Sequence, residues 1–164
     1  MALIMQKRSF NLVLMPIKNN DVVWMAKAIQ QAKLAKAHNE VPIGAVIVYN
    51  GELIAQSFNQ SLTLSDPSAH AEINVLRQAG KCLNNYRLKG ATLYVTLEPC
   101  IMCLGAMVHA RIDRLVYAAK DPKKNSVSTF QQMTSSLNHT MDIQGGILEG
   151  EAATILKNFF KEKR

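Results

Sequence analysis

The run ATLYVTLEP at residues 91–99 is the feature that most constrains the fold. Apart from its threonines the run is apolar up to Leu97, and such a continuous apolar run is typical of a strand buried on both faces. A strand of this kind needs other layers on both sides of its sheet. Helix-like patterns flank it along the chain, so we expect an α/β protein in which helices cover both faces of a central sheet.

The other segments extend this pattern. Asn50-Gly51 joins two β-branched runs, which is the strongest short-range signal for a β-hairpin. Residues 121–140 are polar and predict at most a short helix. The order of elements predicts a three-layer α/β/α sandwich around a central mixed five-stranded sheet. The expected strands are 41–49, 52–59, 91–99, 114–120 and 141–148, and the expected helices are 22–38, 69–80, 100–111 and 149–164.

The length of 164 residues fits one domain with its own core. We expect residues 20–164 to form this domain and residues 1–19 to form an N-terminal tail, within which Met5 or Met15 is an alternative start of translation. The apolar stretch in the tail is too short for a signal peptide and lacks a convincing cleavage site. No stretch is long enough to span a membrane. The cysteine spacing fits a reducing compartment, so we expect a cytoplasmic protein.

Two of the three cysteines lie in the motif EPCIMC. Cys100 and Cys103, at the start of the expected helix 100–111, point to one side and can share a zinc ion. A helix N-terminus also favours the thiolate, and Pro99 suits the first turn because its missing N–H has no partner there. A structural zinc site wants four protein ligands, and the chain has no second cysteine pair, so the cysteines need a histidine. The candidates are His38, His70, His109 and His139.

His70 stands out among these histidines because the motif HAE, residues 70–72, lies at the start of an expected helix. Three protein ligands would leave a fourth position for water, which is the arrangement of a catalytic zinc site. Residues two apart on a helix diverge by about 200°, so Glu72 would not normally bind the same metal as His70. We expect Glu72 instead to carry a proton from the water to the substrate.

Basic residues outnumber acidic ones, 19 to 12, and the formal net charge is +7. This balance fits an RNA partner without requiring one. The basic residues gather in two groups, and Phe159 and Phe160 lie within the second. These two aromatic side chains suit stacking on bases as well as packing on the core. The basic residues gather as Lys120, Lys123 and Lys124, and as Lys157, Lys161, Lys163 and Arg164.

The HAE and PCIMC motifs together resemble those of the zinc deaminase superfamily. The segments VPIGAVIV, DPSAHAEINVLRQAG and NYRLKGATLYVTLEPCIMCLGAMVHARI are similar to bacterial tRNA-specific adenosine deaminases, and the similarity covers about residues 20–164. The resemblance implies the cytidine deaminase-like fold and a homodimer. It also implies hydrolysis of adenosine to inosine at the wobble position of a tRNA anticodon stem-loop, by water that zinc activates.

The same resemblance implies roles for individual residues. One Zn²⁺ per subunit would be held by His70, Cys100 and Cys103, and Glu72 would be the catalytic proton shuttle. Asn59 would hydrogen-bond the flipped base and Val41 would lie in the motif that lines its pocket. The main chain near Ala71 and Cys100 would complete the site, and Asp121 matches a residue that precedes the RNA-contacting loop.

One segment departs from the family pattern. Residues 121–128 read DPKKNSVS, whereas the family commonly has a stretch rich in glycine and alanine after its aspartate. The RNA contacts of this loop are therefore left open.

Two other functions remain possible at this stage. The same zinc centre serves deaminases of free bases or nucleotides, such as guanine or cytosine derivatives, which do not need a basic surface. A non-catalytic, zinc-stabilised RNA-binding module is the other alternative. Glu72 argues against that module, because a purely structural site has no use for a carboxylate beside an open position.

Overall fold

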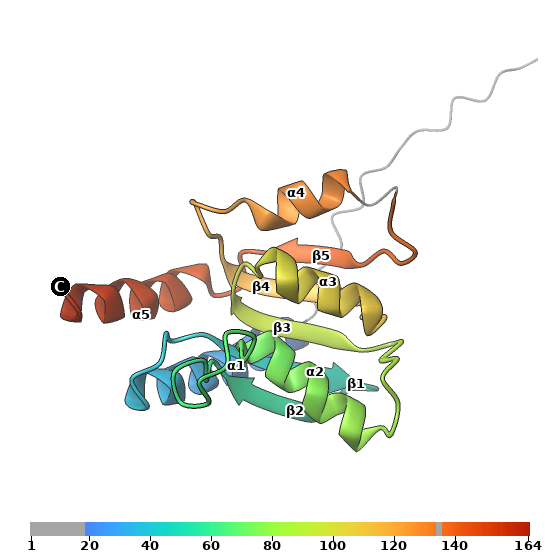
Figure 1. Ribbon diagram of the computed structural model, residues 1–164, viewed down its shortest axis with the longest axis horizontal. Helices are drawn as coiled ribbons and strands as arrows, with labels where there is room; N and C mark the ends of the chain where they lie inside the picture. The colour runs from blue at the N-terminus through green and yellow to red at the C-terminus, as the bar shows by residue number, and fades with distance from the viewer. Residues whose placement is uncertain (1–18, 134–135) are drawn as a thin grey trace, which may run out of the picture.

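The computed structural model describes residues 19–133 and 136–164, so the predicted tail of residues 1–19 lies outside the described residues except for its last residue (Figure 1). Five helices and five strands are present in the described residues. The strands are β1 (Gly44–Tyr49), β2 (Glu52–Phe58), β3 (Thr92–Leu97), β4 (Arg114–Ala119) and β5 (Asp142–Gly145). The helices are α1 (Asn19–Ala37), α2 (Ala71–Cys82), α3 (Ile101–His109), α4 (Ser126–Gln132) and α5 (Glu149–Glu162).

The strands form one mixed sheet in the order β2-β1-β3-β4-β5. β1 pairs antiparallel with β2 and β3, whereas β4 pairs parallel with β3 and β5. β2, β3, β4 and β5 therefore all run in one direction and β1 runs in the other. The predicted mixed five-stranded sheet is confirmed.

Helices cover both faces of the sheet (Figure 1). One buried cluster joins the sheet to α2, α3 and α4, and a second joins it to α1 and α5. β3 is the middle strand of the sheet and contributes side chains to both clusters. Leu93 and Val95 belong to the first cluster, while Tyr94 between them belongs to the second. The continuous apolar character of β3 follows from this double burial, and the predicted three-layer sandwich is confirmed.

The hairpin between β1 and β2 turns at Asn50-Gly51, as predicted. Both residues have positive φ, 51° and 79°, which is the geometry of a type I′ turn and matches the twist of the strands. The expected short helix within residues 121–140 is α4. Two expected helix starts were too early, because α2 begins at Ala71 and α3 at Ile101, and one was too late, because α1 begins at Asn19.

A buried ion pair fixes α1 against the sheet. Arg114 of β4 donates from Nη1 and Nη2 to the two carboxylate oxygens of Asp21, at 2.7 and 2.8 Å. Tyr94 Oη also donates to Asp21 Oδ1 at 2.8 Å, and the Asp21 side chain is 1% exposed. Bidentate pairing of this kind has a defined geometry, so it sets the position of the helix as well as stabilising it.

The strand directions bring the predicted site residues to one edge of the sheet. The carboxyl ends of β2, β3 and β4 lie at this edge, together with the amino end of β1. Asn59 follows β2, Cys100 follows β3 and Asp121 follows β4, while Val41 precedes β1. Ligands of open α/β sheets bind at such edges, so this edge is the candidate site.

None of the helices in the described ranges is both long enough and apolar enough to cross a membrane.

Gly44 at the start of β1 allows α1 to pack directly on the strand. A Cβ atom at this position would lie 2.1 Å from the carbonyl oxygen of Ala28 and 2.4 Å from the backbone nitrogen of Ala32. Because backbone cannot move aside easily, we expect Gly44→Ala to lower the free energy of unfolding by about 3 kcal/mol, measured by urea denaturation. Gly150→Ala is the matched control. Gly150 is exposed in α5 with open space around its Cβ position, so that variant should gain about 0.5–1 kcal/mol.

Candidate active site

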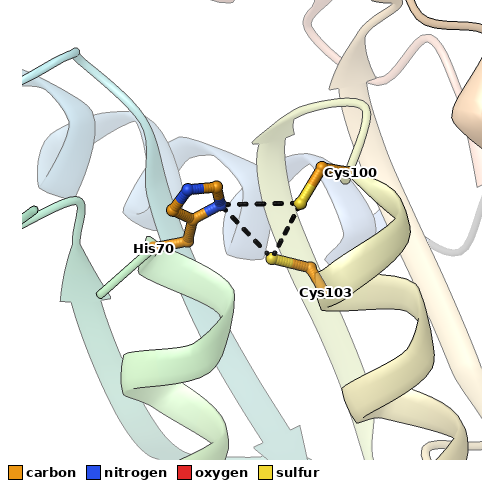
Figure 2. Close-up of side chains that lie close together, drawn as sticks. All are labelled: His70, Cys100 and Cys103. Carbon is orange, nitrogen blue, oxygen red and sulfur yellow. Dashed lines mark hydrogen bonds between the residues drawn. The ribbon is translucent and has the colours of Figure 1, made fainter. Parts of the chain in front are cut away.

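Three predicted metal ligands converge at the edge of the sheet where α2 and α3 begin. His70 immediately precedes α2, Cys100 immediately precedes α3, and Cys103 lies in the first turn of α3 (Figure 2). The Nδ1 atom of His70 lies 3.6 Å from Cys100 Sγ and 3.5 Å from Cys103 Sγ. The two Sγ atoms are 3.6 Å apart, and the three residues form a group that could hold a metal ion.

The donor set fits zinc. Tetrahedral zinc with the usual bond lengths separates two sulfur ligands by about 3.8 Å and a sulfur from a nitrogen by about 3.6 Å. The observed separations of 3.5–3.6 Å match three edges of such a tetrahedron. One imidazole and two thiols provide three ligands, which is the number found at catalytic zinc sites.

The backbone next to each helix start aims these side chains at one another. His70 and Cys100 are both N-cap residues with extended backbone, at φ −68° and −75°, and neither side chain caps its helix. Both side chains are therefore free to point into the space between the helices (Figure 2). Pro99 precedes Cys100, the N-cap residue of α3, so the prediction that Pro99 lies in the first turn of this helix was wrong. The divergence of about 200° expected between His70 and Glu72 does not apply either, because it assumes that both residues lie within a helix, and His70 precedes α2.

Hydrogen bonds within the cluster shift the pKa values of its three members in different directions. The hydrogen bond with Cys103 lowers the pKa of Cys100 to about 3, although burial opposes the shift. The same hydrogen bond, together with burial, raises the pKa of Cys103. The hydrogen bond with Cys100 raises the pKa of His70. Cys100 is thus held as a thiolate, and a metal ion entering the cluster would displace the remaining protons.

Glu72 lies beside this cluster as the second residue of α2 and is 4% exposed. Burial raises the pKa of Glu72, and a hydrogen bond with Cys103 opposes that shift. A carboxyl group with a raised pKa accepts and releases protons closer to neutral pH, which suits a general acid–base catalyst. The position and environment of Glu72 are those of a proton carrier.

Asn59 is held by the buried carboxylate of Glu40, which was not among the residues predicted from the sequence. Asn59 Nδ2 donates to Glu40 Oε2 at 3.1 Å, and the backbone N–H of Thr63 donates to Glu40 Oε1 at 2.6 Å. Burial would raise the pKa of Glu40, but these hydrogen bonds hold it below its usual value. Because a carboxylate only accepts hydrogen bonds, Glu40 fixes which side of the Asn59 amide is the donor.

The other expected substrate-binding residues also lie at this edge. Val41 is half-buried in the irregular segment before β1, which begins at Gly44 and not at residue 41 as expected, and Ala71 is buried at the first position of α2. Asp121 follows β4, where its Oδ1 accepts from the backbone N–H of Lys123 at 3.0 Å. Their contacts with a substrate remain predictions.

The remaining histidines lie away from the cluster. His38 Nδ1 is 2.9 Å from the carbonyl oxygen of Leu34, and its ring stacks on Phe58. His109 is exposed at the end of α3, and His139 Nε2 is 2.7 Å from the carbonyl oxygen of Ile112. Geometry thus selects His70 from the four candidates.

Two buried glutamates were missed from the sequence. Glu40 precedes the VPIG segment, and Glu98 precedes Pro99 of the PCIMC motif; they are 0% and 5% exposed. A signal was available for Glu98, because a carboxylate directly after a strand buried on both faces needs hydrogen-bond partners. Those partners come from distant parts of the chain and could not be identified from spacing.

Comparisons with known proteins agree with this geometry. The family model of MafB19-like deaminases matches residues 19–164. The tRNA-specific adenosine deaminase of Agrobacterium fabrum is 48% identical over 145 residues, which cover 86% of this chain and 94% of the relative. The chain belongs to the MafB19-like deaminase family and to the tRNA-specific adenosine deaminases. The corresponding protein of Bacillus subtilis is 45% identical over 88% of this chain and 91% of its own length.

Solved structures place this deaminase in the same group. A structure from a study of A-to-I editing by tRNA:A34 deaminases at the wobble position is 46% identical, with a TM-score of 0.78. The match covers 82% of this deaminase and 99% of that chain. The fold is accordingly the cytidine deaminase-like α/β/α sandwich that the motifs implied.

The three-residue cluster predicts which cysteines bind metal. We expect Cys103→Ser to weaken binding of Co²⁺, used as a spectroscopic substitute for zinc, by at least about a hundredfold, because a thiolate ligand is lost. Titration followed by thiolate-to-cobalt charge-transfer absorption measures this change. Cys82→Ser is the matched control, because Cys82 is exposed at the end of α2. Equal loss of metal in both variants would contradict the assignment.

Proposed function

We propose that this deaminase hydrolyses adenosine to inosine at the wobble position of a tRNA anticodon. The observation that carries the proposal is the His70, Cys100 and Cys103 cluster with the buried Glu72 beside it. The chain around that cluster is 44–48% identical to several proteins named tRNA-specific adenosine deaminase. Hydrolysis consumes one water and releases one ammonia for each inosine formed.

The residues of the cluster would hold one Zn²⁺ per subunit. Zinc, when bound, would supply a Lewis acid that lowers the pKa of water, so that the water loses a proton more readily near neutral pH and becomes a better nucleophile. Glu72 takes a proton from the attacking water and gives it to the ring nitrogen next to C6 of adenine. Glu72 then takes the second proton from the hydroxyl that the water oxygen has formed on C6 and delivers it to the exocyclic nitrogen. That nitrogen leaves as ammonia while the C6–N bond breaks and C6 becomes the carbonyl carbon of inosine.

The neighbouring residues would bind the flipped base. Asn59, oriented by Glu40, offers its amide at the end of β2. Val41 contributes an apolar wall, and the main chain near Ala71 and Cys100 completes the pocket. Asp121 starts the turn that faces the anticodon loop. We also propose that residues 20–164 are a single deaminase domain and that the protein acts in the cytoplasm.

The basic charge favours RNA over a free base or nucleotide as the substrate. The net charge is +7, and Lys120, Lys123 and Lys124 are exposed next to the candidate site. Phosphate contacts dominate the affinity of proteins for nucleic acids, whereas a free base offers no phosphate and a free nucleotide offers only its own. In the C-terminal basic segment, Phe159 is buried in α5, while Phe160 is half exposed and could contact RNA.

The substrate can be tested with a tRNA anticodon stem-loop that carries adenosine at the wobble position. We expect sequencing of the product to show A-to-G changes at that position. We also expect KM to rise about tenfold or more between 50 and 200 mM salt, because several phosphate contacts are lost. Rapid deamination of free nucleosides or free bases without activity on the stem-loop would contradict the proposal.

Glu72→Gln separates chemistry from binding in the same assay. Glutamine keeps the size of the side chain but cannot carry the proton, so we expect kcat to fall at least about a thousandfold. Zinc content and stem-loop affinity should stay within about twofold, since His70, Cys100 and Cys103 are unchanged. Undiminished activity would remove Glu72 from the mechanism.

We propose further that this deaminase is a homodimer, as the family resemblance implies. A groove of about 720 Å³ between α2 and α3 has an apolar lining that includes Ile73, Leu76 and Ala106. Ile101 and Met102 on α3 are also exposed, by 49% and 40%. Exposed apolar side chains that gather near a groove are typical of protein interfaces, and we infer that a second copy covers them.

The dimer can be tested by sedimentation equilibrium at micromolar concentrations. We expect the wild type to be a dimer and Met102→Glu to raise its dissociation constant by at least about tenfold, because a charge would enter an apolar interface. Leu34→Glu on the exposed face of α1 is the matched control, since Leu34 is 45% exposed and lies on the other face of the sheet. A monomeric wild type would refute the dimer, and equal effects of the two variants would refute this interface.

A further inference from the structure

Glu98 is a buried carboxylate that the proposed mechanism does not use. It lies between the end of β3 and Pro99, two residues before Cys100, and is 5% exposed. Its Oε2 accepts the backbone N–H of Asp121 at 3.0 Å, and its Oε1 accepts the backbone N–H of Val127 at 2.9 Å. Both oxygens of one side chain therefore hold a distant segment of backbone, which we call the basic turn (residues 121–127).

These two hydrogen bonds close the basic turn at both of its ends. Val127 is the second residue of α4, and the first N–H groups of a helix have no partner within the helix. Asn125, the N-cap residue, makes no side-chain capping bond and has a left-handed backbone with φ 45°. Glu98 thus supplies from β3 the cap that the segment itself does not provide.

The sheet places the basic turn beside the candidate metal site of His70, Cys100 and Cys103. β3 and β4 are parallel neighbours up to the pair Leu97 and Ala119, and the backbone N–H of Glu98 donates to the Ala119 carbonyl oxygen at 2.8 Å. The two strands therefore leave the sheet together. The chain after β3 leads to Cys100, and the chain after β4 leads into the basic turn. Glu98 links the two segments where they diverge.

The basic turn carries charge that suits RNA. Lys123 and Lys124 are exposed, and Lys124 Nζ lies 3.7 Å from Asp121 Oδ2. The turn has no glycine, unlike the corresponding loop of the family pattern. A loop that is already ordered loses less conformational entropy when it binds, so holding the turn in place favours affinity for a ligand that the lysines contact.

We propose that Glu98 is a positioning residue that fixes the basic turn beside the candidate metal site, so that Lys123 and Lys124 contact phosphates of the anticodon stem-loop. The RNA part of this proposal rests on the proposed function. The structural part, in which Glu98 holds the turn through two hydrogen bonds, does not rest on the proposed function. Glu98 acts through the backbone of the turn and does not touch the reacting atoms.

Glu98→Gln tests the hold directly in the full-length zinc-loaded protein. Glutamine has one acceptor oxygen, so its NH₂ group must face one of the two backbone N–H donors and a hydrogen bond is lost. We expect amide hydrogen exchange across residues 121–127 to accelerate by about tenfold or more, measured by mass spectrometry. Glu52→Gln is the matched control, because Glu52 is exposed at the start of β2. Unchanged exchange in Glu98→Gln would overturn the proposal.

Kinetics on the stem-loop separate positioning from catalysis. We expect Glu98→Gln to raise KM about three- to tenfold while kcat stays within about twofold and zinc content is unchanged. Glu52→Gln should leave both parameters unchanged. A fall in kcat with an unaltered KM would overturn the positioning role.

A double-mutant cycle identifies the lysines as the groups that Glu98 positions. Lys123→Gln combined with Lys124→Gln should raise KM and make it less sensitive to salt, because two phosphate contacts are removed. Adding Glu98→Gln to that variant should raise KM much less than it does in the wild type. Additive effects would show that Glu98 acts elsewhere and would overturn the proposal.

Two further outcomes have distinct meanings. If Glu98→Gln does not fold, the lysine variant, which keeps Glu98, still decides whether the basic turn contacts RNA, and unchanged KM and salt dependence there would overturn the proposal. If the wild type does not act on the stem-loop, the proposed function and the RNA part of this proposal are both refuted. Hydrogen exchange would then still decide whether Glu98 holds the turn.

Discussion

The position of β3 between an antiparallel and a parallel neighbour is the constraint on which the site depends. Because β1 runs opposite to β3 while β4 runs with it, the amino end of β1 and the carboxyl ends of β2, β3 and β4 share one edge of the sheet. α2 and α3 both start at that edge. Their N-terminal ends favour negative charge, which suits the thiolate of Cys100. A different strand order would separate His70 from both cysteines.

Three buried glutamates at this edge have different environments and correspondingly different properties. Glu40 accepts hydrogen bonds from Asn59 and from the backbone of Thr63, and its pKa is lowered. Glu98 accepts two backbone N–H groups and links two segments of chain. Glu72 is buried with fewer compensating donors, and its pKa is raised. Different environments thus suit different roles. The hydrogen bonds of Glu40 and Glu98 suit holding structure, whereas the raised pKa of Glu72 suits moving protons.

The features that were predicted correctly depend on residues close together in the chain. The Asn50-Gly51 turn is a two-residue signal, and Cys100 and Cys103 are brought together by a single turn of helix. The errors were also local: the starts of α2 and α3 were placed one or two residues too early and that of α1 three residues too late, because an N-cap and a first helical residue differ in backbone angles that composition does not reveal. The Asp21–Arg114 pair and the partners of Glu98 join residues 93, 23 and 29 positions apart, and no pattern within a short window reports them.

The sequence by itself determined the types of the elements and the residue types of the candidate metal site, with Glu72 near it. These depend on hydrophobic periodicity and on the donor chemistry of cysteine and histidine, which are properties of short segments. Only the tertiary structure decided how His70 is aimed at the cysteines and how the 121–127 segment is held. Both were decided by strand pairing: the sheet brings chain segments 23 to 33 residues apart to within hydrogen-bond distance, and the free energy of burying the whole core fixes that arrangement.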